Sequence, residues 1–210
     1  MIPSEIKATV ALFSKKRILI VGDAMIDAYA EGDVDHISAE APVPIIRQRS
    51  TRFVLGGAGN VASNVAAMGG AVTLVTIAGR DERGKTLKNL CTRAGIRLLC
   101  VIDPSRHTTT KTRIISRLHQ HQIARIDKES TESIKPEIEK RLIAIVEKLA
   151  PHDVVIVSDY AKGCVTKDVV KALKAKFGPS TIVADNKPKN APLMRGIYAI
   201  TPNMKEAAEL

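Results

Sequence analysis

Short apolar runs alternate along the chain with segments in which apolar residues recur at every third or fourth position. The runs are rich in β-branched residues and contain few polar ones, which is typical of strands that are covered on both faces. We expect core strands at Arg17–Val21, Val72–Ile77, Asp153–Ser158, Thr181–Ala184 and Ile197–Ile200. The alternation of strands and helices predicts an α/β fold with a doubly wound, mostly parallel sheet.

Helical spacing marks four segments between these strands. They are Ala58–Met68, Glu82–Ala94, Lys135–Leu149 and Thr166–Phe177. The third has the clearest pattern, because Ile138, Leu142 and Leu149 recur at helical spacing.

Two stretches interrupt the alternation, and neither has a convincing helical pattern. Residues 29–55 contain Pro42, Pro44 and the strand-like segment Val43–Arg49. Residues 108–127 contain two strand-like segments, KTRIISR and QIARID, joined by the polar turn LHQH. Insertions of this kind commonly form a small β subdomain over a ligand site. We therefore predict that residues 1–210 form one domain, with a β-sheet lid built from about residues 29–55 and 108–127.

The composition is that of a soluble globular domain, with 45% hydrophobic and 26% charged residues. No apolar run approaches the ~18 residues of a membrane span, and the N-terminal segment does not resemble a signal peptide. We expect a cytoplasmic protein without a membrane partner. Cys91, Cys100 and Cys164 lack metal-ligand spacing, which predicts reduced thiols.

The formal net charge of +10 changes the range of expected partners. Aromatic residues make up only 3% of the chain, and the basic residues are dispersed rather than grouped. Proteins that bind nucleic acids usually have a basic stripe or stacking aromatic residues, so we expect no nucleic-acid partner. A positive field suited to phosphosugars and nucleotides fits the charge, and so does a basic surface without a partner.

The first candidate motif is GDAMIDAY, which begins at Gly22 directly after the first predicted strand. Open parallel sheets bind ligands at the carboxyl ends of their strands, where Asp23 and Asp27 would lie. Carboxylate oxygens can accept hydrogen bonds from sugar hydroxyl groups. The alternative is that Asp27 only caps or decorates a loop.

The second motif, LGGAGNVASNVAAMG, has two interpretations. Gly57, Gly59 and Ala62 match a dinucleotide-binding fingerprint, and Asp81 lies at the spacing of a ribose-binding acid. That fingerprint should follow the first core strand, whereas here it follows the proline-containing insertion.

In the other interpretation, Gly56 and Gly57 allow a ligand to approach the backbone at a helix N-terminus. Asn60 and Asn64 are four residues apart and share a helical face, so one amide could reach a sugar hydroxyl group. A glycine hinge before a packed helix explains the same residues without any ligand.

The third motif is TPNMKEAAEL, at the end of the sequence. Asn203 and Glu206 are three residues apart at the start of a predicted helix, and such a pair can orient a hydrated Mg²⁺ ion. A helix cap explains the pair equally well. Because the sequence stops one or two turns into this helix, we expect a truncated domain.

The segment KTRIISR offers a phosphate site. Alternate residues of a strand share a face, so Lys111, Arg113 and Arg117 could converge on one anion, and Arg125 of the partner strand could join them. Arginine suits bidentate contact with phosphate oxygens. The alternative is a charged edge strand that discourages pairing with other chains.

Together the motifs resemble a known family. GDAMIDAY, EAPVP, GGAGN, the pair KTRIISR and ARIDKE, SDYAKG and TPNMKE occur in the same order as in the ribokinase-like, or phosphofructokinase B, carbohydrate kinases. The resemblance runs from about Ile18 to the end. Ile37–Pro44, Ser158–Gly163 and Thr201–Asn203 resemble the branch that phosphorylates heptose 7-phosphate, often as the first half of a bifunctional ADP-heptose synthase.

The resemblance implies a ribokinase-like fold, ATP with Mg²⁺, and transfer of the γ-phosphoryl group to the anomeric hydroxyl group for lipopolysaccharide core synthesis. It implies roles for ten residues. These are sugar contacts from Asp27, Gly56, Gly57 and Asn60, cleft positions for Asp159 and Lys162, nucleotide or metal roles for Asn203 and Glu206, and nucleotide-binding roles for Asp185 and Lys187. The register of the last two is less certain, because Asn186 replaces the proline that the branch usually has.

One signature of the family is not found. Its Gly-Ala-Gly-Asp loop, which carries the anion hole and the catalytic base, has no match in these 210 residues, so we expect them to be inactive alone. We also expect a homodimer formed through the lid. The alternatives are another sugar kinase of the family, a nicotinamide oxidoreductase and a non-catalytic dimerisation module.

Overall fold

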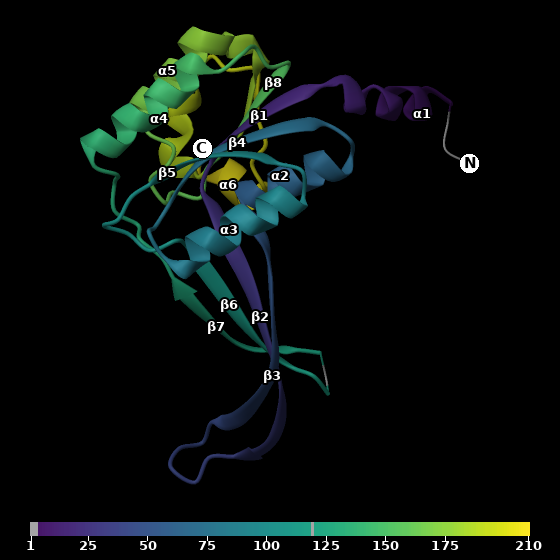
Figure 1. Ribbon diagram of the computed structural model, residues 1–210, viewed down its shortest axis with the longest axis vertical. Helices are drawn as coiled ribbons and strands as arrows, with labels where there is room; N and C mark the ends of the chain where they lie inside the picture. Colours follow the sequence, from purple (N-terminus) through teal and green to yellow (C-terminus); the bar gives the residue numbers. More distant parts are fainter. Residues whose placement is uncertain (1–3, 119) are drawn as a thin grey trace.

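The chain folds into two β-sheets, one entirely parallel and one mixed (Figure 1). The computed structural model describes residues 4–118 and 120–210. A six-stranded sheet has the strand order β10-β9-β8-β1-β4-β5, and a four-stranded sheet has the order β3-β2-β6-β7. We call the second sheet the lid.

Every strand pair in the six-stranded sheet is parallel. Its strands are β1 (Arg17–Gly22), β4 (Ala71–Ala78), β5 (Arg97–Ile102), β8 (Val154–Ser158), β9 (Ile182–Asp185) and β10 (Ala199–Ile200). The predicted α/β fold and five of these strands are confirmed. The sequence analysis missed β5, a half-buried strand at the end of the sheet.

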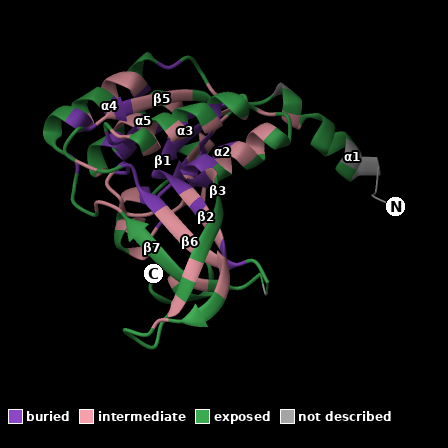
Figure 2. Ribbon diagram, turned by 60° about the horizontal axis from the view of Figure 1, so that its bottom comes forward, coloured by how far each residue is buried: buried purple, intermediate pink, exposed green. Residues whose placement is uncertain are grey.

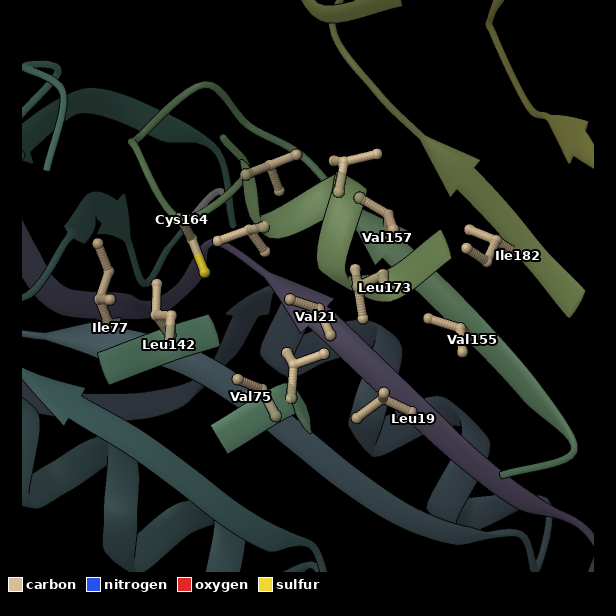
Figure 3. Close-up of a cluster of buried hydrophobic side chains, with 14 of the residues drawn as sticks. Leu19, Val21, Val75, Ile77, Leu142, Val155, Val157, Cys164, Leu173 and Ile182 are labelled. Atoms are coloured by element: carbon tan, nitrogen blue, oxygen red, sulfur yellow. The ribbon is translucent and has the colours of Figure 1, made fainter. Parts of the chain in front are cut away.

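Four helices cover the sheet and match the predicted segments to within one or two residues. They are α2 (Ala58–Ala67), α3 (Glu82–Arg93), α4 (Pro136–Lys148) and α5 (Lys167–Phe177). Successive residues of β1 point to opposite faces. Leu19 packs in a cluster with Leu142 of α4 and Leu173 of α5 (Figure 3), whereas Ile20 belongs to the cluster formed with α2 and α3.

Shorter helices lie around this framework. They are α1 (Ser4–Ala11), η1 (Phe13–Lys15), η2 (Pro179–Thr181), η3 (Pro188–Met194) and α6 (Met204–Ala208). Figure 1 shows α1 extending away from the body of the molecule. In the part of the chain that the structure describes, no helix is both long enough and apolar enough to cross a membrane.

The lid consists of β2 (Ala24–Ile37), β3 (Pro44–Gly57), β6 (Thr110–Ser116) and β7 (Gln122–Lys128). The predicted hairpin is confirmed: β6 and β7 pair antiparallel, and β6 pairs parallel with β2. His119, in the turn of this hairpin, lies outside the described residues. The lid begins at Ala24 rather than near residue 29, because β2 follows β1 after a single residue. It projects from the body (Figure 1), and most of its buried residues lie near the base, with Gly32 and Ser116 buried farther out (Figure 2).

Candidate functional site

Asp23 lies at the junction between β1 and the lid. It is 3% exposed, and its carboxylate accepts hydrogen bonds from the backbone N–H groups of Tyr160, Lys162 and Cys164 at 2.8–3.0 Å. Burial raises the pKa of Asp23 more than these donors lower it. The carboxylate therefore anchors the loop after β8, and its predicted contact with a sugar stays a prediction.

The loop that follows β8, residues 159–164, is shaped by a second buried carboxylate. Asp159 accepts hydrogen bonds from the N–H group of Ala161 and from Nδ2 of Asn190, at 2.8 and 2.7 Å. Asp159 thus supports the loop from beneath rather than facing a ligand directly. The side chain of Lys162 leaves this loop and reaches Glu129, with 2.6 Å between Nζ and Oε1.

The glycine motif brings the lid and the N-terminus of α2 into close contact. Gly57 has a φ of +54°, and a Cβ atom there would lie 2.4 Å from the carbonyl oxygen of Asp23. A Cβ atom at Gly56 would lie 2.8 Å from Oδ2 of Asp27. Asn60 is exposed in the first turn of α2, beside the partial positive charge of the helix N-terminus. These positions are compatible with the predicted sugar contacts, which stay predictions.

The dinucleotide-binding interpretation of this motif is wrong. The glycines follow β3 of the lid, not a strand of the parallel sheet. Asp81 is the N-cap of α3: it accepts hydrogen bonds from the backbone of Gly84 at 2.9 Å and from Oγ1 of Thr108 at 2.7 Å. Its carboxylate is therefore used inside the fold and is not placed to bind a ribose.

One face of the lid carries paired charges close to its base. Asp27 and Lys111 are neighbours in the register of β2 and β6. Arg113 donates a hydrogen bond from Nη1 to Oδ1 of Asp27 at 2.6 Å, and its guanidinium lies 5.4 Å from the centre of the Tyr29 ring. The predicted residues Asp27, Lys111 and Arg113 therefore lie on one surface. Since β6 lies between β2 and β7, the edge-protection alternative does not apply to Lys111 or Arg113.

A series of ion pairs connects this face with the loop after β8. Lys111 contacts Asp127 at 2.9 Å and Glu129 at 3.4 Å, and Arg125 contacts the other oxygen of Asp127 at 2.9 Å. Glu129 completes the series through its contact with Lys162. Hydrogen bonding by Lys111 lowers the pKa of Asp127, and hydrogen bonding by Lys162 lowers the pKa of Glu129, so both carboxyl groups stay ionised.

Arg117 does not join these cations, which corrects the predicted convergence. Its Nη1 lies 3.8 Å from Oδ1 of Asp33, farther along the lid. The physical reason is that β6 ends at Ser116 and its register against β7 shifts between Ile114 and Ile115. Strict alternation along one strand therefore fails before Arg117 is reached.

A second group of polar residues lies at the end of β9. Lys187 Nζ contacts Oε1 of Glu206 at 2.7 Å and lies 5.7 Å from the centre of the Tyr160 ring. Burial and the nearby charge of Glu206 raise the pKa of Asp185, which ends the strand. Asp185 and Lys187 thus lie beside the loop after β8, and their predicted roles toward a nucleotide stay predictions.

Asn203 and Glu206 form a capping box at the start of α6. Oδ1 of Asn203 accepts from the N–H group of Glu206, and Oε2 of Glu206 accepts from the N–H group of Asn203. Both oxygens of Glu206 are therefore occupied, one by Lys187 and one by the cap. Among the described residues no group of three or more His, Cys, Asp or Glu side chains could hold a metal ion. Asn203 and Glu206 are engaged with each other and with Lys187, and their predicted role toward a hydrated Mg²⁺ ion stays a prediction.

Two residues of the site were missed by the sequence analysis. Arg106 is nearly buried and donates hydrogen bonds to the carbonyl oxygens of Lys162 and Glu132, at 2.7 and 3.2 Å. Glu129 links the lid to the loop after β8. Glu129 lies within the segment ARIDKE, whose likeness to the family was the one available signal; Arg106 had none.

A family model described as pfkB family carbohydrate kinase matches residues 15–210. Among characterised proteins, the chain is 42% identical over 201 residues to the bifunctional protein HldE of Caulobacter vibrioides, covering 94% of this chain and 41% of that protein. It is 40% identical over 200 residues to D-beta-D-heptose 7-phosphate kinase of Bordetella bronchiseptica, covering 93% of this chain and 62% of that kinase. The chain thus spans less than two thirds of either relative.

Solved structures show the same fold. Phosphofructokinase-2 from Escherichia coli, in its tetrameric inhibited form, superposes with a TM-score of 0.75 at 18% identity, covering 93% of this chain and 63% of that chain. A carbohydrate kinase from Agrobacterium tumefaciens superposes with a TM-score of 0.65 at 21% identity, with the same coverage. At such identities the likeness concerns the fold alone.

Proposed function

Because the chain belongs to the pfkB family of carbohydrate kinases, we propose that it serves the phosphorylation of a heptose 7-phosphate at its anomeric hydroxyl group, with ATP as the phosphoryl donor. The name of the relative from Bordetella, D-beta-D-heptose 7-phosphate kinase, supports the substrate. A role in ADP-heptose synthesis for the lipopolysaccharide core is part of the same proposal. The observation that carries the proposal is the charged lid face formed by Asp27, Lys111 and Arg113, opposite the loop that carries Lys162.

Each part of this surface suits a different part of the sugar phosphate. Asp27 can accept hydrogen bonds from hydroxyl groups, and the glycine pair allows the sugar to approach the N-terminus of α2. Lys111 and Arg113 can bind the 7-phosphate through charge-assisted hydrogen bonds. Binding at several such points fixes the orientation of the anomeric hydroxyl group toward the donor.

A carboxylate must take the proton of the anomeric hydroxyl group as the γ-phosphoryl group is transferred. We propose that this base is not Asp23, Asp27 or Asp159. Asp23 and Asp159 are occupied by donors of the loop after β8, and Asp27 is paired with Arg113. The residues of this chain would then hold and orient the sugar, and Lys187 would favour an anionic nucleotide near the end of β9.

Calorimetric titration of the chain with heptose 7-phosphate tests the proposal. We expect Asp27→Ala and Asn60→Ala each to weaken binding by about 1–3 kcal/mol, the cost of a buried polar group left without its partner. Asn64→Ala is the matched control, because Asn64 is exposed one turn farther along α2. Equal affinity in all four proteins, or no binding by the unmodified chain, would contradict the proposed function.

The cytoplasmic location and the homodimer stay part of the proposal. Exposed apolar side chains on the lid support a dimer formed there: Ile37, Val43, Ile45, Leu118 and Ile126 are each at least 43% exposed. Sedimentation of the chain and of Ile45→Lys tests this part. A dimer that persists unchanged in the variant would place the contact elsewhere.

A further inference from the structure

Glu129 lies between two lysines that belong to different parts of the molecule. Its Oε1 is 2.6 Å from Nζ of Lys162, on the loop after β8, and its Oε2 is 3.4 Å from Nζ of Lys111, on the lid. The three side chains are only 16–23% exposed. Partial burial strengthens such contacts and makes an unpaired charge there costly.

The carboxylate neutralises the cations that a phosphate group would need. Lys111 already contacts Asp127, and Arg125 contacts the same carboxylate. Counting Lys111, Arg125 and Lys162 against Asp127 and Glu129 leaves a net charge of only +1 (three cations, two anions). An incoming anion therefore meets cations that are already paired.

We propose that Glu129 is an internal competitor for the phosphate group of the sugar. Its carboxylate occupies the position between Lys111 and Lys162, and the phosphate group binds by displacing it. Carboxylate and phosphate oxygens accept the same charge-assisted hydrogen bonds at similar distances. A phosphomonoester carries about −1.5 to −2 charges at pH 7, so it can displace a singly charged carboxylate, whereas a singly charged ligand gains little. Glu129 would thus set the affinity of the site and its selectivity for dianionic ligands. This inference rests on the proposed function.

The alternative role is a mechanical link between the lid and the loop. The loop has other supports, because Asp23 binds the backbone N–H of Lys162 and Arg106 binds its carbonyl oxygen. Removing the charge of Glu129 should therefore leave the loop in place, release the ammonium group of Lys162 and leave that of Lys111 paired with Asp127 alone. The two roles predict opposite changes in phosphate affinity.

The test is calorimetric titration of the 210-residue chain and its Glu129→Gln variant with inorganic phosphate, heptose 7-phosphate and unphosphorylated heptose. We expect the variant to bind both phosphate ligands about fivefold more tightly or better, since a competing ion pair has been removed. Its affinity for the unphosphorylated sugar should not change. Adding Lys162→Gln to the variant should abolish the gain.

Glu132→Gln is the matched control. It removes the same charge three residues away, its side chain is exposed, and its contact with Arg106 uses the backbone carbonyl group. Weaker binding of all ligands by Glu129→Gln, or unchanged phosphate affinity, would overturn the inference. The inorganic phosphate titration separates the two proposals. If the unmodified chain does not bind heptose 7-phosphate, but Glu129→Gln raises the affinity for inorganic phosphate, the proposed function is contradicted and the role of Glu129 is supported.

Discussion

The parallel sheet and the lid use the same backbone geometry for different purposes. Strands of the parallel sheet such as β1 and β8 are nearly all apolar and are covered by helices on at least one face. Two strands of the lid, β2 and β3, are longer, at 14 residues each, but half of the residues of β3 are exposed. Two ladders of the lid contain register shifts. The comparison indicates that the parallel sheet contributes most of the stability, which leaves the lid available for the ligand recognition proposed above.

The sharpest test of this contrast compares two apolar residues. Leu142 is fully buried in the core, whereas Ile126 on the lid is 59% exposed. We expect Leu142→Ala to lower the free energy of unfolding by about 2–5 kcal/mol, because the change leaves a cavity. Ile126→Ala should change it by no more than about 0.5 kcal/mol. Urea denaturation measures both, and similar losses would contradict the contrast.

The boundary between the two regions is tested at Gly57. Alanine there must adopt a positive φ and also contacts the backbone of Asp23, so we expect a loss of about 2–4 kcal/mol. Gly95 is the control, because it has a similar φ of +69° but no atom within 4 Å of an added Cβ. Gly95→Ala should cost about 1–2 kcal/mol. If thermal denaturation shows that both variants lose the same free energy of unfolding, the close contact between Gly57 and Asp23 does not contribute to stability.

Within the lid, two arginines should differ in their effect on binding. Arg113→Ala should weaken binding of heptose 7-phosphate about tenfold or more, because a charge-assisted hydrogen bond is lost. Arg117→Ala should change it less than about twofold, because Arg117 is half-exposed and pairs with Asp33. Calorimetry at two salt concentrations measures both, and added salt should reduce the difference. Equal effects would restore the convergence predicted from the sequence.

The smallest expected effect concerns the acid stability of the lid. Lys111 lowers the pKa of Asp127 in the folded protein, so this pair stabilises the fold above the unfolded pKa of about 3.9. The stabilisation is lost as the pH falls through the lower, folded pKa. Asp127→Asn should therefore cost up to about 1 kcal/mol at pH 6 and almost nothing near pH 2. A pH-independent difference in urea denaturation would exclude this role for the ion pair.

The same contrast explains what the sequence could predict. Core strands and helices depend on the local order of apolar residues, so five strands and four helices of the framework were predicted close to their observed bounds. The strand β5 was missed because one short apolar run beside a helix gives little periodicity, and its position at the end of the sheet leaves it half-buried. The local order of apolar residues was therefore sufficient to predict the elements whose apolar residues are almost completely buried.

The candidate site depends on contacts that no local pattern contains. Arg113 and Asp27 are 86 residues apart, and Lys162 and Glu129 are 33 residues apart. Asp23 was expected near a ligand because of its place after a strand, and the resemblance implied a cleft position for Asp159. The structure places each residue directly after a strand of the parallel sheet. It also shows that backbone donors of the loop after β8 use their oxygens. Which carboxylate is free and which is occupied depends on the tertiary structure.

The single residue between β1 and β2 also couples the lid to the loop that carries Lys162. With 14 residues at roughly 3.3 Å each, β2 measures about 45 Å along its length, and it begins directly after Asp23. Asp23 also holds three N–H groups of that loop. A displacement of the lid at Asp23 would therefore be transmitted to the loop, which makes the two a single mechanical unit.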